Sequence, residues 1–393
     1  MTQPHFDVVI AGGAAIGSAT AYFLTAAAGF TGSVAVIEAD NSYRYSATAL
    51  SAASIRHQFS TPENIGMSLF GTQFLRHFSQ DMAVDGDCPD LDFHEGGYLF
   101  LATAAGLETL RRNHALQTSL GADIALLDPA QLKARYPWLN TDDLAGGALG
   151  LSGEGWLDAY GMMQGMRRKA IAQGAVYLNH RVASLDHSAG RIRGVRLADG
   201  GRIACGAVVN AAGTGATALA RTAGIDLPVH ARKRSVFYVQ CPHPLPGCPM
   251  VIDPGGAYFR PEGQGYITGI SPPADQDPDA SDYDVQHALF DEVLWPILAA
   301  RAPAFEALRC SRSWAGHYDM NLFDQNLILG PHPAIDNLYF ANGLSGHGMQ
   351  QAPAIGRALS ELITTGTFQT LDLSRLGWAR ILNRQPIIEQ NVV

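Results

Sequence analysis

A run of small residues near the start of the chain has the composition of a phosphate-binding turn. The segment Gly12 to Gly17 (GGAAIG) lies between an apolar run, 6–11, and a stretch of small apolar residues, 18–24. A sharp strand-to-helix turn aims the free N–H groups and the positive dipole end of the helix at one point, where a pyrophosphate can bind. Glu38 stands at the tip of the next apolar run, 33–37, and can accept hydrogen bonds from both ribose hydroxyls. The spacing predicts a βαβ unit that binds a dinucleotide.

The turn departs from the G-x-G-x-x-G pattern at one position. Its second glycine is replaced by Ala14, where the backbone approaches the pyrophosphate most closely. An added methyl group is small, so we interpret Ala14 as a tolerated variant. The ordered series of strand, turn, helix, strand and terminal acid is far more specific than the glycine pattern alone.

The N-terminal region also allows a second interpretation, because no charged residue lies between Val8 and Ile37. Such a run is typical of a signal peptide or a membrane helix. However, the first seven residues contain an Asp and neither Lys nor Arg, and glycines interrupt the run where the βαβ unit needs them. The sequence therefore favours a buried unit and predicts no transmembrane segment.

Composition restricts the class of protein. With 393 residues, 47% apolar and 16% charged, the chain can form one large or two ordinary globular domains with sizeable cores. The net charge of −9 argues against nucleic acid and anionic membranes as partners, because neutralising phosphates requires a basic face. The five cysteines are scattered without a C-x-x-C pair, so we expect no disulfide framework, no metal site and a reduced, cytoplasmic setting.

Elements later in the chain are expected to bring more small residues to the ligand. An apolar strand, 207–213, ends in small residues, which leave room at the carboxyl edge of a parallel sheet. A strand at 338–342 leads into a glycine-rich turn and a helix over 354–363, so a second helix N-terminus is predicted beside the ligand. Its positive dipole end suits an electron-accepting ring that gathers negative charge on reduction. Other predicted helices are 62–78, 107–120, 159–173, 285–300 and a short one capped by Asp128. Other predicted strands are 96–101, 175–178, 181–182 and 233–239, and hairpins are predicted over 191–205 and 256–270. Residues 146–157 are predicted to connect the two parts, and 272–284 are predicted to form an acidic loop.

Together these stretches resemble the D-amino acid oxidase superfamily of FAD enzymes, in its sarcosine oxidase and D-amino acid dehydrogenase branch. The matching residues span nearly the whole chain in family order: Val8 to Gly17 with Glu38, Ser54 to Phe59, Val208 to Gly213, Tyr258 to Glu262, Trp314 to Tyr318 and Gly343 to Pro353. The resemblance implies an α/β plus α+β fold. A Rossmann-like FAD-binding domain is expected from the discontinuous segments 1–85, 146–220 and 322–393. A substrate domain built on an antiparallel sheet is expected from 86–145 and 221–321.

The resemblance also implies where the cofactor lies. The glycine turn would hold the pyrophosphate and Glu38 the adenosine ribose, Val182 would meet the adenine through its backbone, and 346–350 would line the pyrimidine edge of the flavin. Covalent members use a Cys near the position of Gly316 or a His near Ser51, and neither is present, so we predict non-covalent FAD. The predicted cofactor-binding residues are Gly12, Gly13, Ala14, Ala15, Ile16, Gly17, Glu38, Ala39, Ser46, Ala53, Ser54, Ile55, Val182, Ala212, Gly213, Gly346, His347, Gly348, Met349 and Gln350.

The activity implied is oxidation of a C–N bond in a small-molecule amine or amino acid. The flavin accepts a hydride from the carbon next to the nitrogen, giving an imine that water hydrolyses. The expected substrates are D-amino acids and sarcosine-like or opine-like secondary amines. Their carboxylate needs a fixed cation, for which Arg56 is the first choice, with Arg234 and Arg260 behind it. Arg56, Tyr258, His347 and Tyr318 are the predicted catalytic residues; a structural ion pair for Arg56 and packing roles for the other three are the alternatives.

The sequence leaves the electron acceptor open among oxygen, a quinone and an electron-transfer protein. Ile267 aligns with a Lys that speeds the reaction with oxygen in some oxidases, which favours a dehydrogenase or slow oxidase. Gln350 stands where a common carboxylate-binding Lys is expected. Two rival hypotheses remain: a non-catalytic flavoprotein with an assembly or chaperone role, and an NAD(P)-dependent dehydrogenase. The second of these leaves the turn at Gly346 and the segment 258–262 unexplained.

Overall fold

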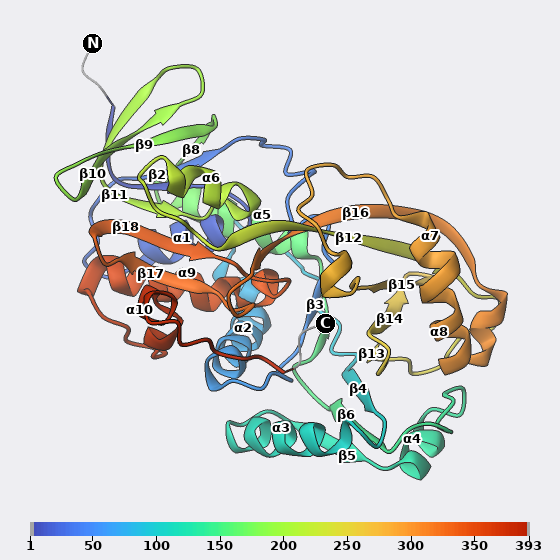
Figure 1. Cartoon of the computed structure of the whole chain (residues 1–393). Coiled ribbons are helices and arrows are strands. Elements are labelled where there is room, and N and C mark those ends of the chain that lie inside the picture. The colour runs from blue at the N-terminus through green and yellow to red at the C-terminus, as the bar shows by residue number, and fades with distance from the viewer. Residues whose placement is uncertain (1–3, 391–393) are drawn as a thin grey trace.

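The computed structural model describes residues 4–390 and folds them into two lobes, each built on an eight-stranded sheet (Figure 1). In the first sheet β1 pairs in parallel with β2 and β11, while β2 pairs in parallel with β8 and β11 with β18. Strands β1, β2, β11 and β18 are rich in apolar residues and are largely buried, as strands covered on both faces must be, whereas the edge strand β8 is more exposed. The predicted Rossmann-like sheet is confirmed. Its strands are β1 (His5–Ala11), β2 (Val34–Glu38), β8 (Val176–Asn179), β9 (Val182–Ser188), β10 (Arg191–Leu197), β11 (Arg202–Asn210), β17 (Ile328–His332) and β18 (Ile335–Asn342).

Helices cover this sheet and make its core. Helix α1 (Ala15–Ala26) packs on α9 (Gly348–Thr365) and α5 (Ala159–Ala172), and α9 also packs on α2 (Pro62–Asp81). The contact between α1 and α9 is close because Gly356 faces Ala19 without a side chain. A Cβ atom added at Gly356 would lie 2.5 Å from the carbonyl carbon of Ala19. The two helices whose N-termini flank the ligand region are therefore held against each other by small residues.

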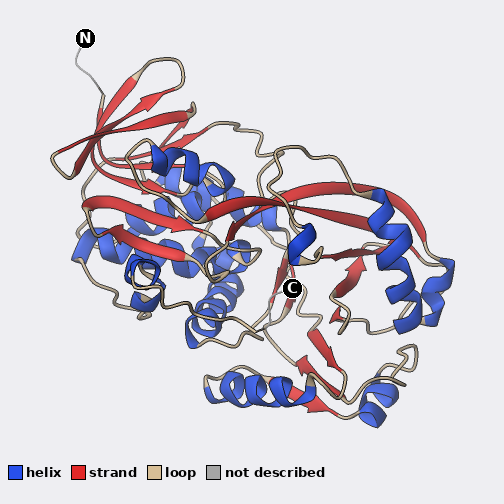
Figure 2. Cartoon of the chain, viewed as in Figure 1, coloured by secondary structure: helices blue, strands red, loops and turns tan. Residues whose placement is uncertain are grey.

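The second sheet is predominantly antiparallel, as predicted for the substrate domain. Its strand order is β16-β12-β15-β14-β13-β4-β6-β5, and only β13 and β4 run parallel within it among residues 4–390. Figure 2 shows the long strands β12 and β16 reaching from the first lobe into the second. Their bounds are β4 (Tyr98–Ala102), β5 (Ile124–Leu127), β6 (Gly146–Gly150), β12 (Val229–Gln240), β13 (Met250–Ile252), β14 (Ala257–Glu262), β15 (Gly265–Ile270) and β16 (Arg309–Asn321).

Short elements complete the fold. Helix α4 (Pro129–Arg135) begins with a capping box, in which the Asp128 side chain accepts from the Gln131 N–H and the Gln131 side chain accepts from the Asp128 N–H. A two-strand ladder of β3 (Ser54–Ile55) and β7 (Gly155–Trp156) joins the lobes. The remaining helices are α3 (Leu107–Ser119), α6 (Ala216–Arg221), α7 (His287–Leu289), α8 (Trp295–Arg301) and α10 (Trp378–Leu382). Within 4–390, no helix is both long and apolar enough to cross a membrane.

Three local predictions differ from the structure. Helix α9 starts at Gly348, not at residue 354, because Pro353 is tolerated in the second turn at the loss of one amide donor. The predicted helix 285–300 contains a π turn, Phe290–Leu294, just before Pro296, which has no N–H to donate. Residues 146–150 form β6 inside the second sheet and not, as expected, a connector belonging to the first domain. A Cβ atom at Gly147 would lie 3.1 Å from the Phe100 carbonyl oxygen, so close packing favours glycine in this strand. Because glycine is uncommon inside strands, the sequence of this segment does not look like a strand.

The α1–α9 contact leads to a stability prediction. Gly356→Ala should lower the free energy of unfolding by about 1–3 kcal/mol, because its methyl group overpacks a rigid backbone contact. Gly66→Ala in α2 is the control, because its Cβ would meet only Leu371 Cδ2, at 3.6 Å. That variant should be neutral or up to about 1 kcal/mol more stable through helix propensity. Urea denaturation measures both; equal effects of the two substitutions would contradict the close α1–α9 contact.

Candidate functional site

A cavity of about 820 Å³ runs along the carboxyl ends of the parallel strands. Its wall includes Gly12 after β1, Glu38 at the end of β2 and Ala212 after β11. Leu344 and Gly346, which follow β18, line it as well. Parallel sheets bind their ligands at this edge, because the loops that leave the strand ends diverge there. The cavity therefore lies where the strand pattern predicted a ligand.

The predicted cofactor-binding residues divide into two groups around this cavity. Thirteen line it: Gly12, Ala14, Ala15, Ile16, Glu38, Ala39, Ser46, Val182, Ala212, Gly213, Gly346, Gly348 and Met349. The other seven do not line it: Gly13, Gly17, Ala53, Ser54, Ile55, His347 and Gln350.

Close backbone packing shapes the first helix N-terminus. Gly12 has φ +100°, and a Cβ atom there would lie 2.3 Å from the Ala211 carbonyl oxygen; one at Gly17 would lie 1.9 Å from the Gly12 carbonyl oxygen. Both positions thus require glycine. Ala14 has φ −70°, which any residue adopts, and this explains why the motif tolerates alanine there. The Glu38 carboxylate accepts from the N–H groups of Gly13 (2.8 Å) and Asp40 (2.9 Å), which fixes it at the cavity wall.

The second helix N-terminus is set by the loop before α9. Gly346 has φ +92°, and a Cβ atom there would lie 2.6 Å from the Tyr318 ring. The Asp319 carboxylate accepts from the N–H groups of Gly343 (2.9 Å) and Leu344 (3.3 Å). Burial raises the pKa of Asp319 to about 6, although these hydrogen bonds oppose the shift. The loop and the β16 strand beneath it are thus tied together at the cavity.

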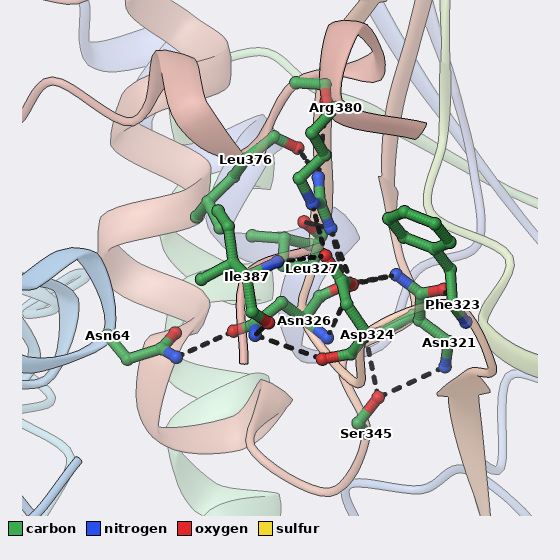
Figure 3. Close-up of polar contacts among 12 residues, drawn as sticks. Asn64, Asn321, Phe323, Asp324, Asn326, Leu327, Ser345, Leu376, Arg380 and Ile387 are labelled. Carbon is green, nitrogen blue, oxygen red and sulfur yellow. Dashed lines mark hydrogen bonds and ion pairs between the residues drawn. The ribbon is translucent and has the colours of Figure 1, made fainter. Parts of the chain in front are cut away.

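A buried polar network anchors the same loop from behind (Figure 3). Arg380 Nε donates to Asp324 Oδ2 at 2.7 Å, and Asn321 Nδ2 donates to Asp324 Oδ1 at 2.8 Å. The Asn321 N–H donates to Ser345 Oγ at 3.1 Å, and the Ile387 N–H donates to Asp324 Oδ2. Arg380 and Asp324 form a buried ion pair, and such a pair needs several additional hydrogen bonds to offset the cost of removing its charges from water. The C-terminal segment therefore supports the loop that precedes α9.

Arg56 lies in an aromatic surround beyond the cavity wall. Its side chain is 2% exposed, and its guanidinium carbon lies 4.4 Å from the Phe59 ring centroid, 5.1 Å from that of Phe100 and 5.9 Å from that of Tyr98. Its Nη2 contacts His347 Nε2 at 3.1 Å. Burial, together with the charge of Arg56, lowers the pKa of His347 to about 3. His347 is therefore neutral near pH 7 and accepts a hydrogen bond from Arg56.

The two predicted tyrosines lie with this cluster. Burial raises the pKa of Tyr258, and the neighbouring hydroxyls of Tyr318 and Tyr98 raise it further. Burial also raises the pKa of Tyr318, while the charges of Arg234 and Arg56 oppose it. Both hydroxyls are therefore protonated at neutral pH. Tyr318 lines the cavity as well, so it connects the Arg56 cluster to it.

Side chains from distant elements fix the segment that carries Arg56. Gln350 Oε1 accepts from the Arg56 N–H at 2.8 Å, so the residue that replaces the family lysine positions Arg56 instead. Arg260 donates twice to the Ala52 carbonyl oxygen, from Nε at 3.0 Å and Nη2 at 2.8 Å. These bonds hold the strained backbone next to them, because Ala53 has φ +54°. Arg260 thus has a structural contact, and Arg234 is bonded to both Asp277 oxygens at 2.8 Å.

Sequence reasoning missed Glu154 and Tyr98. Glu154 is fully buried and accepts from the His57 N–H and from Gln58 Nε2, next to Arg56. It is the only charged residue between positions 144 and 157, and an isolated acid in a glycine-rich apolar run was the available signal. Tyr98 stands in a predicted strand, and only the fold reveals that its ring faces the guanidinium.

Comparison with known proteins finds clear relatives of this chain. The family model described as FAD dependent oxidoreductase (DAO) matches residues 7–362. The chain is 42% identical to the Xenopus laevis FAD-dependent oxidoreductase domain-containing protein 1, over 98% of this chain and 85% of that protein. It is 27% identical to the sarcosine oxidase subunit beta of Rhizobium meliloti, over 93% and 86% of the two chains. The L-proline dehydrogenase of P. horikoshii superposes with a TM-score of 0.86 at 26% identity, covering 98% of this chain and 100% of that one.

The Arg260 contact leads to a second prediction. Arg260→Gln should lower the free energy of unfolding by about 2–4 kcal/mol, because it removes buried charged hydrogen bonds to the Ala52 carbonyl oxygen. Arg191→Gln is the control, since its pair with Asp336 is exposed and such pairs contribute about 0–1 kcal/mol. Denaturant unfolding followed by tryptophan fluorescence measures both. A loss for Arg260→Gln no larger than for the control would refute the positioning role.

Proposed function

The chain belongs to the DAO family of FAD-dependent oxidoreductases, and from that premise we propose that it oxidises the C–N bond of an amino acid or N-alkylated amino acid. Its relatives include amino-acid and sarcosine oxidases. The proposed substrates are D-amino acids, sarcosine-like amines and opine-like secondary amines that carry a carboxylate next to the nitrogen. The observation that carries this proposal is the buried Arg56 guanidinium, whose charge acts on Tyr318, a residue that lines the cavity.

Arg56 is proposed to bind the substrate carboxylate. A guanidinium keeps its charge at all physiological pH values and presents a planar fork of donors that matches a carboxylate. In a site that excludes water, the attraction between the two charges is much stronger than at the surface. The ring centroids of Phe59, Phe100 and Tyr98 lie within 5.9 Å of the guanidinium carbon, and such close surroundings favour a small substrate.

The polar groups near Arg56 suit an uncharged amine. His347 is neutral, and its Nε2 already accepts from Arg56, so it is a poor base for a substrate ammonium. The protonated hydroxyls of Tyr258 and Tyr318 can each donate or accept one hydrogen bond to orient the substrate. We infer that the substrate reacts with its nitrogen unprotonated and that these groups orient it.

The residues along the cavity fit the FAD that the family requires. The glycine turn and the start of α1 would receive the pyrophosphate, Glu38 the ribose, and the loop before α9 the flavin ring. When bound, FAD supplies the acceptor for a hydride from the carbon next to the amine nitrogen. The protein residues bind and orient the substrate and exclude water; the imine product is hydrolysed by solvent.

We further propose that FAD is held without a covalent bond and that the enzyme is a dehydrogenase or slow oxidase. Ser51 lines the cavity. Gly316 lies against Leu50, because a Cβ atom added at Gly316 would lie 3.0 Å from Leu50 Cβ. Neither residue offers a nucleophile of the Cys or His type. Ile267 is an apolar, buried side chain in β15, where a lysine would assist the reaction with oxygen.

Acid precipitation tests the attachment of the cofactor. The yellow colour should pass entirely into the supernatant as free FAD, because neither position provides a residue for a covalent link. Absorbance of the pellet and supernatant at the flavin band is the measurement. Yellow colour that stays with the washed pellet would contradict non-covalent binding.

An anaerobic substrate panel tests the proposed activity. D-amino acids, sarcosine, dimethylglycine and opine-like secondary amines are mixed with the oxidised holoprotein, and flavin absorbance is followed. At least one carboxylate-bearing amine should bleach the flavin, whereas its decarboxylated analogue should not. Reoxidation by a dye acceptor should exceed reoxidation by oxygen. Absence of bleaching across the panel would favour a non-catalytic flavoprotein.

Two Arg56 variants test the carboxylate site. Arg56→Ala should lower kcat/KM by about 10-fold to 150-fold, as expected from loss of a charged hydrogen bond of roughly 1.5–3 kcal/mol. Arg56→Lys keeps the charge without the planar fork and should show an intermediate loss. The flavin absorbance spectrum of each variant verifies that the cofactor is retained. Unchanged kinetics with both variants would remove Arg56 from the site.

A further inference from the structure

Glu154 is a buried carboxylate with no place in the proposed reaction. Its side chain is 0% exposed, between β6 and β7. One carboxylate oxygen accepts from the His57 N–H at 2.5 Å and the other from Gln58 Nε2 at 2.8 Å. These partners are neutral, and such a group is costly to bury unless a positive charge lies nearby. Arg56, the residue before His57, is a cation whose charge opposes the rise in the pKa of Glu154 that burial causes.

The surrounding backbone is arranged to admit this side chain. A Cβ atom at Gly150 would lie 1.8 Å from Glu154 Oε2, so the strand next to the carboxylate needs a glycine. The Glu154 carbonyl oxygen accepts from the Gly97 N–H at 3.0 Å. Gln58 Nε2 also donates to the Tyr98 carbonyl oxygen at 2.8 Å. Glu154 is therefore bonded to the same turn and the same strand that surround the Arg56 guanidinium.

We propose that Glu154 is a positioning residue that fixes the Arg56 turn and, through its own charge, sets how strongly Arg56 attracts a substrate carboxylate. This inference rests on the proposed role of Arg56. Glu154 itself need not touch the substrate. It acts through the field at Arg56 and through the backbone of His57, to which it is hydrogen-bonded.

The direction of the pH effect follows from the charge of Glu154. Burial raises its pKa to about 7, while hydrogen bonds from Gln58 and His57 and the charge of Arg56 oppose the shift. Below this pH Glu154 is neutral, and the positive field of Arg56 acts on the ligand in full. Above it, the negative charge of Glu154 offsets that field. Carboxylate ligands should therefore bind more weakly as the pH rises through about 7.

Apart from Asp319, the other titratable groups around Arg56 and Glu154 whose pKa is shifted ionise well away from this pH. Burial lowers the pKa of His57 to about 4 and that of His347 to about 3, and it raises that of Tyr98 to about 12. The pKa values of Tyr258 and Tyr318 are raised by burial too. Near His57, Glu95 forms an ion pair with Arg76, which lowers the pKa of Glu95. Arg260 forms an ion pair with Glu262. Asp319, whose pKa is about 6, faces the loop N–H groups of Gly343 and Leu344.

The test is a titration of the FAD-loaded protein with acetate and benzoate, simple carboxylates, followed by flavin absorbance between pH 5.5 and 9. In the wild type, the Kd should rise by about 5-fold to 50-fold across this range, as expected for two charges that interact at an effective dielectric of about 20. Glu154→Gln should bind tightly with little pH dependence. Glu95→Gln is the control, because it removes another acid near His57. The pKa of Glu95 is lowered, so this acid does not change charge near pH 7, and the variant should keep the wild-type profile.

A second measurement uses the wild type alone, in case Glu154→Gln does not fold. Because binding and protonation are reciprocal, carboxylate binding near pH 7.5 should take up a fraction of a proton. Titration calorimetry in buffers of different ionisation enthalpy measures this uptake.

The outcomes separate this inference from the proposed function. Carboxylates that bind without proton uptake, or a pH profile that persists in Glu154→Gln, would overturn the role of Glu154 and leave that of Arg56 intact. No spectral change with any carboxylate at any pH would instead refute Arg56 as the carboxylate site.

Discussion

The burial of one permanent positive charge is the constraint around which the site is built. A guanidinium at 2% exposure cannot be neutralised by losing a proton, so its surroundings must compensate for the lost water. Here the compensation comes from the faces of Phe59, Phe100 and Tyr98, from His347 as an acceptor, and from nearby Glu154. Such a position is justified in an enzyme when the charge attracts an anionic group of the substrate.

Holding that charge in place requires both lobes. The backbone from Leu50 to Gln58 receives hydrogen bonds from Trp314 in β16, from Arg260 in β14 and from the β3–β7 ladder. Gln350, in the first turn of α9, accepts from the Arg56 N–H, so the helix that faces the ligand also sets the position of the cation. The proposed substrate site and the proposed cofactor cavity are thus parts of one hydrogen-bonded assembly, and Tyr318 lies at their junction.

The sequence predicted well those features that depend on local pattern. The βαβ unit, the parallel sheet, the hairpin over 256–270 and the acid at the tip of β2 all follow from apolar periodicity and glycine positions, and the structure confirms them. Arg56 and His347 were selected by family resemblance, and the fold brings them into contact. The strand at 146–150 was missed because close packing demands glycines there, which removes the usual strand signal.

Long-range contacts account for what the sequence could not predict. Arg260 was ranked as a possible carboxylate ligand, but its guanidinium is bonded to a carbonyl oxygen 208 positions away in the chain. Gln350 was interpreted as the loss of a lysine, whereas its amide oxygen has a backbone partner 294 positions away. No local pattern records such pairings, since each depends on how elements far apart in the chain pack together.

A crystal structure of the FAD-loaded protein with a bound carboxylate ligand tests the central claim most directly. We predict FAD along the cavity from Glu38 to Gly346, with the ligand carboxylate within hydrogen-bond distance of the Arg56 guanidinium on the side of Tyr318. A carboxylate held by another cation, with Arg56 still enclosed by its aromatic neighbours and out of reach of the ligand, would contradict it.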